Sequence, residues 1–223
     1  MILGFLKRVI NLISNQSVIF IYHNQIDPSN KLKGVNLKGD IQIGKNNIIK
    51  FVNCHGKITI GNYNTLNGPN LILASQINSI SIGSFCSIAR DVTIQEYNHP
   101  TDRVSTYFLG KHIFKEGHKN EFFSKGSIVI GSDVWIGTKS IILSGITIGH
   151  GAIVAGGSVV TKDIPDYAIV GGNPARIIKY RFTKEIIEEL ERIKWWNWSI
   201  EKIVESQYLF SDEVSINTLK KIQ

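Results

Sequence analysis

The sequence predicts an all-β solenoid, a parallel β-helix in which the chain coils in short straight segments, and three observations carry this prediction. An aliphatic residue returns at every sixth position between residues 128 and 162, and the set is Ile130, Ile136, Ile142, Ile148, Val154 and Val160. Four positions after the first five of these, the residue is again aliphatic or small, namely Val134, Ser140, Ile146, Ala152 and Ser158. Glycine directly follows the aliphatic residue at Gly131, Gly137 and Gly149.

A period of six matches neither an α-helix, with ~3.6 residues per turn, nor a flat strand, with a period of ~2. It matches a β-helix shaped like a prism, in which each side of a coil directs one aliphatic residue toward the axis. Glycine permits the bend between two sides, because without a Cβ atom it tolerates positive φ. An array of antiparallel hairpins would instead show two-residue turns and period-two alternation, and this stretch shows neither.

A recurring tetrapeptide indicates where the other coils lie. Ile-x-Ile-Gly is found at 41–44, 58–61, 80–83, 128–131 and 146–149. Its last interval is 18 residues, the length of a three-sided coil, and the earlier intervals are less regular. With coils beginning near residue 35, we expect a helical cap and lead-in over residues 1–34, the β-helix over 35–180 and a helical tail over 181–223.

The first residues carry an apolar stripe at helical spacing, beginning with Ile2, Leu3 and Leu6. A signal peptide has its positive charges before the apolar run, whereas here Lys7 and Arg8 interrupt it. The run is also shorter than the ~20 residues that span a bilayer. We expect a helix that caps the open end of the β-helix. The alternative is an anchor on a membrane surface, which would make any membrane association peripheral.

The six-residue spacing stops over residues 95–127, a segment that is rich in aromatic residues. A long loop inside a compact repeat domain is usually functional or disordered. Its aromatic content argues against disorder. The sequence therefore predicts a functional loop that leaves the β-helix and returns to it.

The tail is expected to be helical, with Thr183 and Ser199 placed to cap two helices. The buried stripe of the first helix is expected at Ile186, Leu190 and Ile193. Three tryptophans follow this helix, and they are Trp195, Trp196 and Trp198. We expect them to anchor the tail on the body or on a neighbouring subunit, and the alternative is a ligand cage.

The composition fits a globular protein, with 19% charged and 43% hydrophobic residues. A net charge of +7 suggests an anionic partner. The basic residues form no Arg-rich run and no stripe interleaved with aromatics, so nucleic acid is not an expected partner. Cys54 and Cys86 lie far apart and indicate no disulfide framework. We therefore expect reduced thiols and a cytoplasmic location.

Three motifs resemble those of the hexapeptide-repeat acyltransferases. They are Asp133-Val134-Trp135-Ile136-Gly137, Gly156-Gly157-Ser158-Val159-Val160-Thr161-Lys162 and Gly172-Asn173-Pro174-Ala175-Arg176. The similarity is to the branch of galactoside and maltose acetyltransferases, xenobiotic acetyltransferases and capsule or O-antigen O-acetyltransferases, and it covers residues 80–182 closely. Residues 195–203 resemble the tail of the xenobiotic enzymes and of some polysaccharide-modifying ones.

The resemblance implies features that the spacing alone does not give. It implies a left-handed coil, against the usual right-handed crossover between parallel strands. It also implies a homotrimer that holds acetyl-CoA as co-substrate in a groove between two subunits, without a metal ion.

Acyl transfer from a thioester to a hydroxyl needs a base for the hydroxyl proton. The six histidines are His23, His55, His99, His112, His118 and His150. His99 lies just past the last regular hexad, where the resemblance places the catalytic histidine, and the others are expected to be surface or turn residues. A histidine pKa of ~6.5 suits base chemistry near neutrality. Asp102 is expected either to bind the acceptor or to be a solvated, turn-capping carboxylate.

The resemblance maps contacts with the coenzyme A arm onto Thr138, Gly156 and Thr161. It places Trp135 beside the thioester, where a packing role is the alternative. Lys162 and Arg176 are expected to bind the phosphates of the coenzyme, since ammonium and guanidinium groups suit phosphate. If they do not, they are ordinary solvated cations.

Three functions remain open from the sequence. The first is O-acetylation of a sugar hydroxyl in a capsule, O-antigen or related glycan. The second is O-acetylation of a xenobiotic of the chloramphenicol or streptogramin type. The third is a zinc hydrase on the same fold, which would need three histidines converging on one metal ion. Only His150 lies within the regular repeats.

Overall fold

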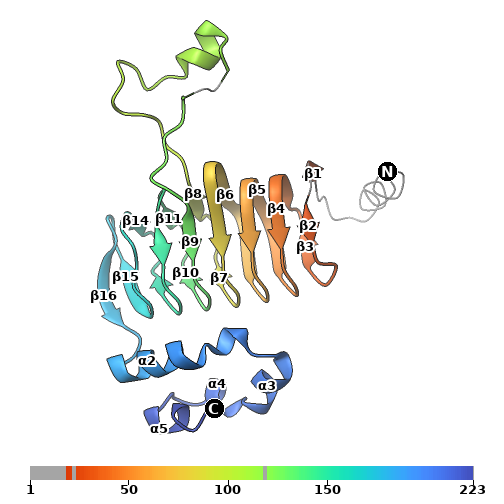
Figure 1. Cartoon of the computed structure of the whole chain (residues 1–223), viewed down its shortest axis with the longest axis vertical. Coiled ribbons are helices and arrows are strands. Elements are labelled where there is room, and N and C mark those ends of the chain that lie inside the picture. The colour runs from red at the N-terminus through yellow and green to blue at the C-terminus, as the bar shows by residue number, and fades with distance from the viewer. Residues whose placement is uncertain (1–18, 22–23, 118–119, 223) are drawn as a thin grey trace.

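The computed structural model describes residues 19–21, 24–117 and 120–222, and their strands wind into a left-handed parallel β-helix (Figure 1). The predicted fold class is confirmed. The helix expected at the N-terminus lies outside the described residues. The division into the three regions 1–34, 35–180 and 181–223 stays a prediction.

The strands are short where the six-residue spacing is regular and long before it. The first coils contain β1 (Ile19–Ile21), β2 (Gln25–Ile26), β3 (Lys31–Lys33), β4 (Asn36–Ile43), β5 (Ile48–Ile60) and β6 (Thr65–Ile82). The middle coils contain β7 (Ser87–Ile88), β8 (Thr93–Gln95), β9 (Ile128–Ile130), β10 (Trp135–Ile136), β11 (Ile141–Ile142) and β12 (Thr147–Ile148). The last are β13 (Ile153–Val154), β14 (Val159–Val160), β15 (Ala168–Gly171) and β16 (Arg176–Tyr180).

Strands of successive coils stack in parallel and form three faces. The first face contains β7, β10, β13 and β15, with Trp135 opposite Ser87 and Ile153. The second face contains β8, β11 and β14, and the third contains β9 and β12. The long β6 pairs with β7, β8 and β9 in turn, so it contributes to all three faces. β16 closes the stack antiparallel to β15.

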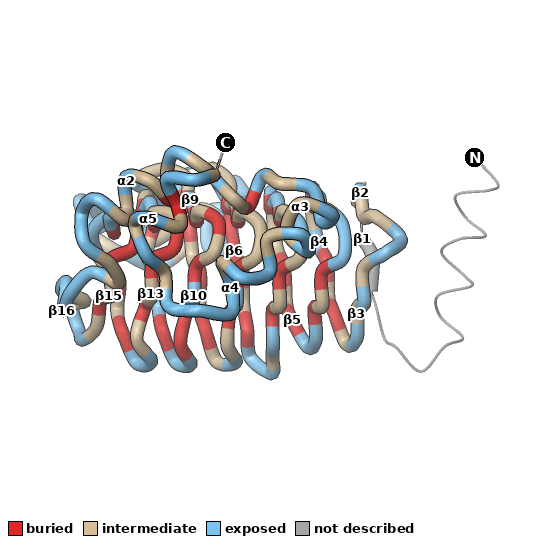
Figure 2. The backbone as a smooth tube through the Cα atoms, turned by 90° about the horizontal axis from the view of Figure 1, so that it is seen from below, coloured by how far each residue is buried: buried red, intermediate tan, exposed pale blue. Residues whose placement is uncertain are grey.

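The core runs along the axis of the prism, and Figure 2 shows its buried positions recurring from coil to coil. Each of the six aliphatic residues at the six-residue spacing is at most 2% exposed. The five residues at the intervening inward positions are buried as well, the most exposed being Ile146 at 5%. Burying an aliphatic side chain of this size contributes roughly 1.5–3 kcal/mol, so the predicted repeat is also the main source of stability.

Strand pairing begins earlier than residue 35. β2 and β3 pair in parallel with β4 and β5, which places Gln25 beside Gln42 and Lys31 beside Ile48. The aliphatic pattern is weak in these coils because asparagine, not an aliphatic residue, fills one inward corner position. A search for recurring isoleucines therefore misses the first turns.

The asparagines at that corner form a ladder along the axis. The side-chain oxygen of Asn30 accepts a hydrogen bond from the backbone amide of Asn47 at 2.7 Å, and that of Asn47 accepts from Asn64 at 2.8 Å. Asn64 in turn accepts from the amide of Cys86 at 2.7 Å, and the Cys86 thiol donates to the carbonyl of Gly131 at 3.1 Å. Cys54 and Cys86 are both buried and free.

The tail contains α2 (Lys184–Ile193), η2 (Trp195–Asn197), α3 (Ile200–Glu205), α4 (Tyr208–Ser211) and α5 (Ile216–Leu219). The predicted helices after Thr183 and Ser199 are confirmed. Ser199 caps α3 by accepting from the amide of Lys202 at 3.2 Å, whereas the Thr183 side chain makes no capping bond. The last two helices were not predicted, because each is only four residues long. Figure 1 shows the tail along one edge of the prism.

Trp195 and Trp196 anchor the tail on the β-helix, whereas Trp198 donates to the Ile193 carbonyl within the tail. Trp196 is buried and stacks on the His150 ring at 4.4 Å, and Trp195 packs against Phe85 at 4.9 Å. The predicted excursion leaves after β8 and returns at β9. It contains a short π-helix, Gly110–Phe114, and projects from the edge opposite the tail (Figure 1).

Candidate active site

His99 lies four residues beyond the end of β8, on the exposed first limb of the excursion. Its Nδ1 atom is 2.6 Å from the backbone carbonyl oxygen of Thr106. A carbonyl oxygen only accepts, so Nδ1 carries the proton and donates. Nε2 is then the unprotonated nitrogen of the neutral ring. The ring also stacks on Phe108 at 4.4 Å with 13° between the planes, which fixes its direction.

Aromatic contacts hold the two limbs of the excursion together. Phe122 packs edge-on against Phe108 at 5.1 Å and against Tyr97 at 5.2 Å. The backbones of Asn98 and Phe123 exchange hydrogen bonds of 2.7 and 2.8 Å. The His99 ring therefore stands on an ordered base, although the loop itself has no regular strands.

Glu96 secures the excursion to the β-helix, and the sequence analysis missed it. Its buried carboxylate accepts from the amides of Gln76 and Ile77 at 3.0 Å and from the side chain of Asn78 at 2.9 Å. Burial raises the pKa of Glu96, but these hydrogen bonds and one from Ser124 together hold that pKa below its ordinary value. The sequence signal that could have pointed to Glu96 was a carboxylate three residues before His99.

Asp102 is exposed on the same segment of the loop, three residues beyond His99. Sequence reasoning also missed Thr106 and Phe108, which set the tautomer and the direction of the His99 ring. Their residue types alone do not predict these contacts with His99, because both contacts depend on the fold of the loop.

The residues expected to bind coenzyme A divide between two corners. Thr138 and Gly156 lie together at the corner after the first face, where the Gly157 amide donates to the Thr138 carbonyl at 2.8 Å. A Cβ atom on Gly156 would come within 3.1 Å of that carbonyl, so the backbones approach closely there. The Thr138 hydroxyl donates to the carbonyl of Arg90 at 2.8 Å. Arg176, exposed at the start of β16, lies near this corner, since the adjacent Ala175 amide donates to Val159.

Thr161 and Lys162 lie at the next corner, beyond β14, and Lys162 is exposed. The excursion with His99 leaves the β-helix at this same corner, two coils away. Trp135 lies in β10 on the first face, between β7 and β13, and its side chain is 54% exposed. A ligand that contacts all six residues must therefore reach from one corner across to the other.

The comparisons with known proteins identify the family. A family model described as bacterial transferase hexapeptide (six repeats) matches residues 127–162. A chloramphenicol acetyltransferase of Klebsiella aerogenes is 44% identical over 133 residues, which are 57% of this chain and 63% of that protein. A probable macrolide acetyltransferase of Lysinibacillus sphaericus is 39% identical over 150 residues, which are 64% of this chain and 82% of that protein.

The chain belongs to the hexapeptide-repeat acyltransferase family. Among solved structures, that of the polySia-specific acetyltransferase NeuO is similar, with a TM-score of 0.58 and 27% identity over 71% of this chain and 66% of that one. The chain spans 63% of the length of the chloramphenicol acetyltransferase that it matches. The family thus follows from the comparisons.

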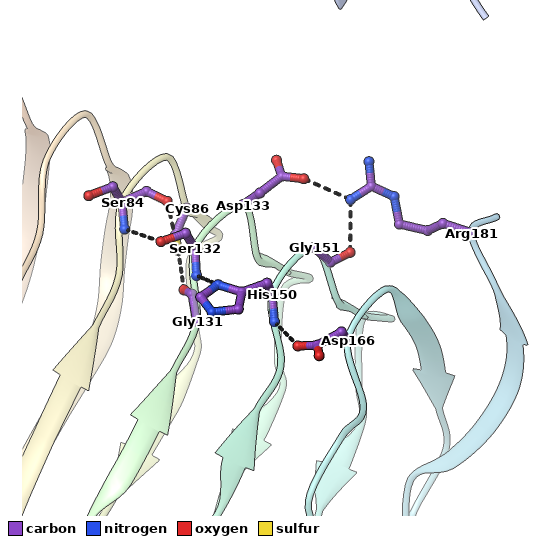
Figure 3. A network of polar contacts seen from close by, with 9 residues as sticks. All are labelled: Ser84, Cys86, Gly131, Ser132, Asp133, His150, Gly151, Asp166 and Arg181. Atoms are coloured by element: carbon purple, nitrogen blue, oxygen red, sulfur yellow. Dashed lines mark hydrogen bonds and ion pairs between the residues drawn. The ribbon is translucent and has the colours of Figure 1, made fainter. Parts of the chain in front are cut away.

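His150 lies apart from the candidate site, on the edge that carries the tail, whereas the His112 ring is 6.4 Å from that of Phe108. His150 is a turn residue, as expected, and it is half-buried under the tail. Its Nδ1 accepts from the amide of Ser132 at 2.9 Å, and its own amide donates to Asp166 at 2.7 Å (Figure 3). Burial lowers the pKa of His150, although Asp166 opposes the shift. His150 is therefore a structural residue.

Residues 19–21, 24–117 and 120–222 contain no group of three or more histidine, cysteine, aspartate or glutamate side chains arranged to hold a metal ion. A zinc hydrase needs such a set, so the described part of the chain gives that hypothesis no site. Nor is any helix within those residues long and apolar enough to cross a membrane.

Proposed function

We propose that the chain transfers an acetyl group from acetyl-CoA to a hydroxyl group, with His99 as the general base. The observation that carries the proposal is the hydrogen bond from Nδ1 to the Thr106 carbonyl. It leaves Nε2 as the acceptor on an exposed ring, available to an incoming hydroxyl. The bond also persists when Nε2 gains a proton, because Nδ1 donates in both states.

In the proposed reaction, Nε2 takes the proton of the acceptor hydroxyl as its oxygen attacks the thioester carbonyl. The carbon–sulfur bond then breaks, and the imidazolium returns the proton to the departing thiolate, giving the acetyl ester and coenzyme A. General-base assistance of this kind is typically worth ~10²–10⁴-fold in rate.

Transfer is proposed to be direct, without an acetyl-enzyme. Burial raises the pKa of both Cys54 and Cys86 to about 12, and neither thiol reaches solvent. A thiol in that state is a poor nucleophile, since the thiolate is the reacting form.

Acetyl-CoA is proposed to lie along the outer surface of the coils, as the resemblance to the family implies. Thr138 and Gly156 would meet its arm by backbone contacts, with Thr161 at the following corner. The exposed Lys162 and Arg176 would bind its phosphates, and the exposed Trp135 would flank the thioester.

For the acceptor we propose a sugar hydroxyl of a capsule, O-antigen or related surface glycan or its precursor. The support is the likeness to the polySia-specific acetyltransferase and the exposure of His99 on the excursion, a loop that projects from the β-helix where an extended polymer can approach it (Figure 1). Asp102, exposed nearby, would contact the acceptor. A xenobiotic hydroxyl is the second candidate, favoured by the 44% identity to a chloramphenicol acetyltransferase.

A homotrimer and a cytoplasmic location belong to the same proposal. The apolar side chains of Val129, Trp135 and Ile141 point outward, one from each face of the prism, and flat β-helix faces with such side chains are suited to burial against neighbours. The two free, buried thiols fit a reducing compartment.

The test is release of coenzyme A thiol from acetyl-CoA, measured with a panel of glycans and with chloramphenicol and related antibiotic alcohols. We expect release with a glycan that His99→Ala abolishes and that folded His150→Ala, on the opposite edge, preserves. Release with chloramphenicol but with no glycan would show that the acceptor is a xenobiotic and not a glycan. Absence of release with every hydroxyl would contradict the proposed reaction.

A further inference from the structure

The positive charge of the chain is concentrated at its N-terminal end. Residues 58–223 contain 17 lysines and arginines and 16 aspartates and glutamates, so nearly all of the net charge of +7 comes from the first 57 residues. Lys162 and Arg176, which would bind the coenzyme phosphates, belong to the nearly neutral part of the chain. The coenzyme therefore does not account for the excess, whereas an anion that contacts the first coils would.

A column of exposed polar side chains lies on these coils. Lys33 of β3 stands opposite Lys50 of β5, and Lys50 stands opposite Asn67 of β6. These three residues are called the basic column. None of them makes a side-chain hydrogen bond or an ion pair within the described part of the chain. Like charges directly opposite each other on neighbouring strands are destabilising, so an anion bound at Lys33 and Lys50 would relieve their repulsion.

Phe51 places an aromatic ring beside the basic column. It directly follows Lys50, at the corner after the first face, and its side chain is 46% exposed. The ring lies against Gly34, where an added Cβ atom would come within 2.5 Å of the ring. The Lys33 ammonium nitrogen is 5.7 Å from the centre of the same ring. The absence of a side chain at Gly34 thus makes room for an exposed ring with a cation next to it.

The packing of the chain does not explain this ring. Phe51 has a φ of 54°, a left-handed conformation that is unfavourable for a bulky residue. Tyr63, Phe85 and Tyr167 have the same conformation at the corner after the third face, but each packs there against another aromatic ring. No aromatic ring packs on Phe51 within the described part of the chain. Backbone strain that persists without a gain in packing points to a function.

We propose that Phe51 and the basic column form a secondary binding site for an acidic glycan, a polymer whose sugars carry carboxylate groups. One sugar stacks the C–H groups of its ring on Phe51, because the face of an aromatic ring is negative and attracts them. Carboxylates pair with the two ammonium groups, and the Asn67 amide bonds a hydroxyl. A lipid surface fits less well, since Phe51 is the only large exposed apolar side chain among residues 24–76.

The site lies on the same face of the prism as Trp135. Ile48, two residues before Lys50, stands opposite Thr65, which stands opposite Ser87, which stands opposite Trp135. Neighbouring strands are ~4.8 Å apart, so the site is about 14 Å from Trp135, the residue expected beside the thioester. An extended glycan can therefore occupy both places at once. This assignment rests on the glycan acceptor proposed above and restricts it to acidic polymers.

The probe is polygalacturonate, in which every sugar carries a carboxylate, and its affinity for the full chain is measured by calorimetry without acetyl-CoA. Two polymers serve as comparison ligands. The methyl ester of polygalacturonate keeps the sugars and loses the charge, whereas polyglutamate keeps the charge and has no sugars. We expect polygalacturonate to bind at least roughly fivefold more tightly than either, because only it offers both stacking and ion pairing.

Phe51→Asn is expected to weaken the binding of polygalacturonate about 2- to 10-fold, the effect of one lost stacking contact. The melting temperature should not fall, because asparagine tolerates positive φ. Asn70 already has this conformation at the equivalent position of the next coil, with a φ of 59°. Loss of affinity in this variant would thus come from the missing ring and not from a misfolded corner.

Lys33→Gln combined with Lys50→Gln should also weaken the binding of polygalacturonate about 2- to 10-fold, with a smaller effect at high salt. The matched control is Lys220→Gln combined with Lys221→Gln, which removes the same charge at exposed positions in the tail. It should leave the affinity unchanged.

Several results would overturn the proposal. Failure of polygalacturonate to bind is one, and equally tight binding of its methyl ester or of polyglutamate is another. Unchanged affinity in Phe51→Asn or in the variant of the two column lysines would show that the polymer binds elsewhere. Tighter binding to phosphatidylglycerol vesicles, at equal concentration of negative charge, would make the partner a lipid surface. Binding as predicted without release of coenzyme A thiol would contradict the proposed reaction alone.

Discussion

His99 and His150 occupy opposite edges of the same prism and differ in the placement of one proton. Each ring stacks on an aromatic side chain at 4.4 Å, His99 on Phe108 and His150 on Trp196. Nδ1 of His99 faces a carbonyl and must donate, whereas Nδ1 of His150 faces the Ser132 amide and must accept. The stacking alone therefore does not distinguish a base from a structural residue.

The difference shows what makes one histidine suited to proton transfer. His99 can gain a proton on Nε2 and keep its hydrogen bond, so its position survives the change of charge. His150 can be protonated only by losing the bond from Ser132, and its surroundings already lower its pKa. The loop edge can thus perform chemistry, while the tail edge holds the helices in place.

The largest expected effect comes from His99→Ala. We expect kcat to fall by ~10²–10⁴-fold, because the acceptor hydroxyl loses its base. The melting temperature and the dissociation constant of acetyl-CoA should stay close to those of the unaltered protein, since the exposed ring leaves no core cavity. Steady-state kinetics, thermal unfolding and calorimetry measure the three quantities. Activity within about threefold of the unaltered protein would remove His99 as the base.

His150→Ala should have the opposite profile. The change removes the stack on Trp196 and leaves the buried Ser132 amide without its acceptor, a combined loss of about 1–3 kcal/mol in the free energy of unfolding. Denaturant titration measures it, and kcat of the folded variant should change little. An equal loss in His112→Ala, whose ring is exposed on the loop, would show that the His150 contacts are not the cause.

The pH dependence of stability sharpens the comparison. Because the pKa of His150 is below the ordinary 6.5 in the folded chain, the unfolded chain binds its proton first as the pH falls. The contribution of His150 to stability is therefore full above about pH 7 and declines through about pH 6. Unfolding measured from pH 8 to 5 should show a smaller loss for His150→Ala than for the unaltered protein. Parallel curves would contradict the lowered pKa.

The coenzyme residues should give a smaller effect, confined to binding. Lys162→Ala and Arg176→Ala are each expected to raise the KM for acetyl-CoA roughly 2- to 10-fold, with little change in the KM for the acceptor. Phosphate binding is the same in the ground and transition states, so kcat should hold. Initial rates at varied acetyl-CoA measure this. If both variants keep the original KM, acetyl-CoA does not contact these corners.

Most of the β-helix could be predicted from the sequence because each inward position repeats one physical requirement. Ile136, Ile142 and Ile148 fill equivalent buried positions. Their regular spacing alone therefore predicts that all three point at the axis. The first coils were not predicted because Asn30 and Asn47 fill an inward corner position with hydrogen-bonded side chains instead of apolar ones.

The site could be predicted in part. The position of His99 after the last regular hexad was visible, but its tautomer depends on the Thr106 carbonyl, which only the folded loop brings near. The end of the tail was not foreseeable either, because its last two helices have only four residues each, and the pairing of Asp133 with Arg181 joins residues 48 positions apart.

The most direct test of the comparison is the protonation pattern of the two rings. Nitrogen-15 NMR of the histidine side chains above pH 8, assigned with His99→Ala and His150→Ala, reports which nitrogen carries the proton. The predicted result is a proton on Nδ1 of His99 and on Nε2 of His150. A proton on Nε2 of His99 would contradict its assignment as the base, because the nitrogen that faces the acceptor would then have no free electron pair.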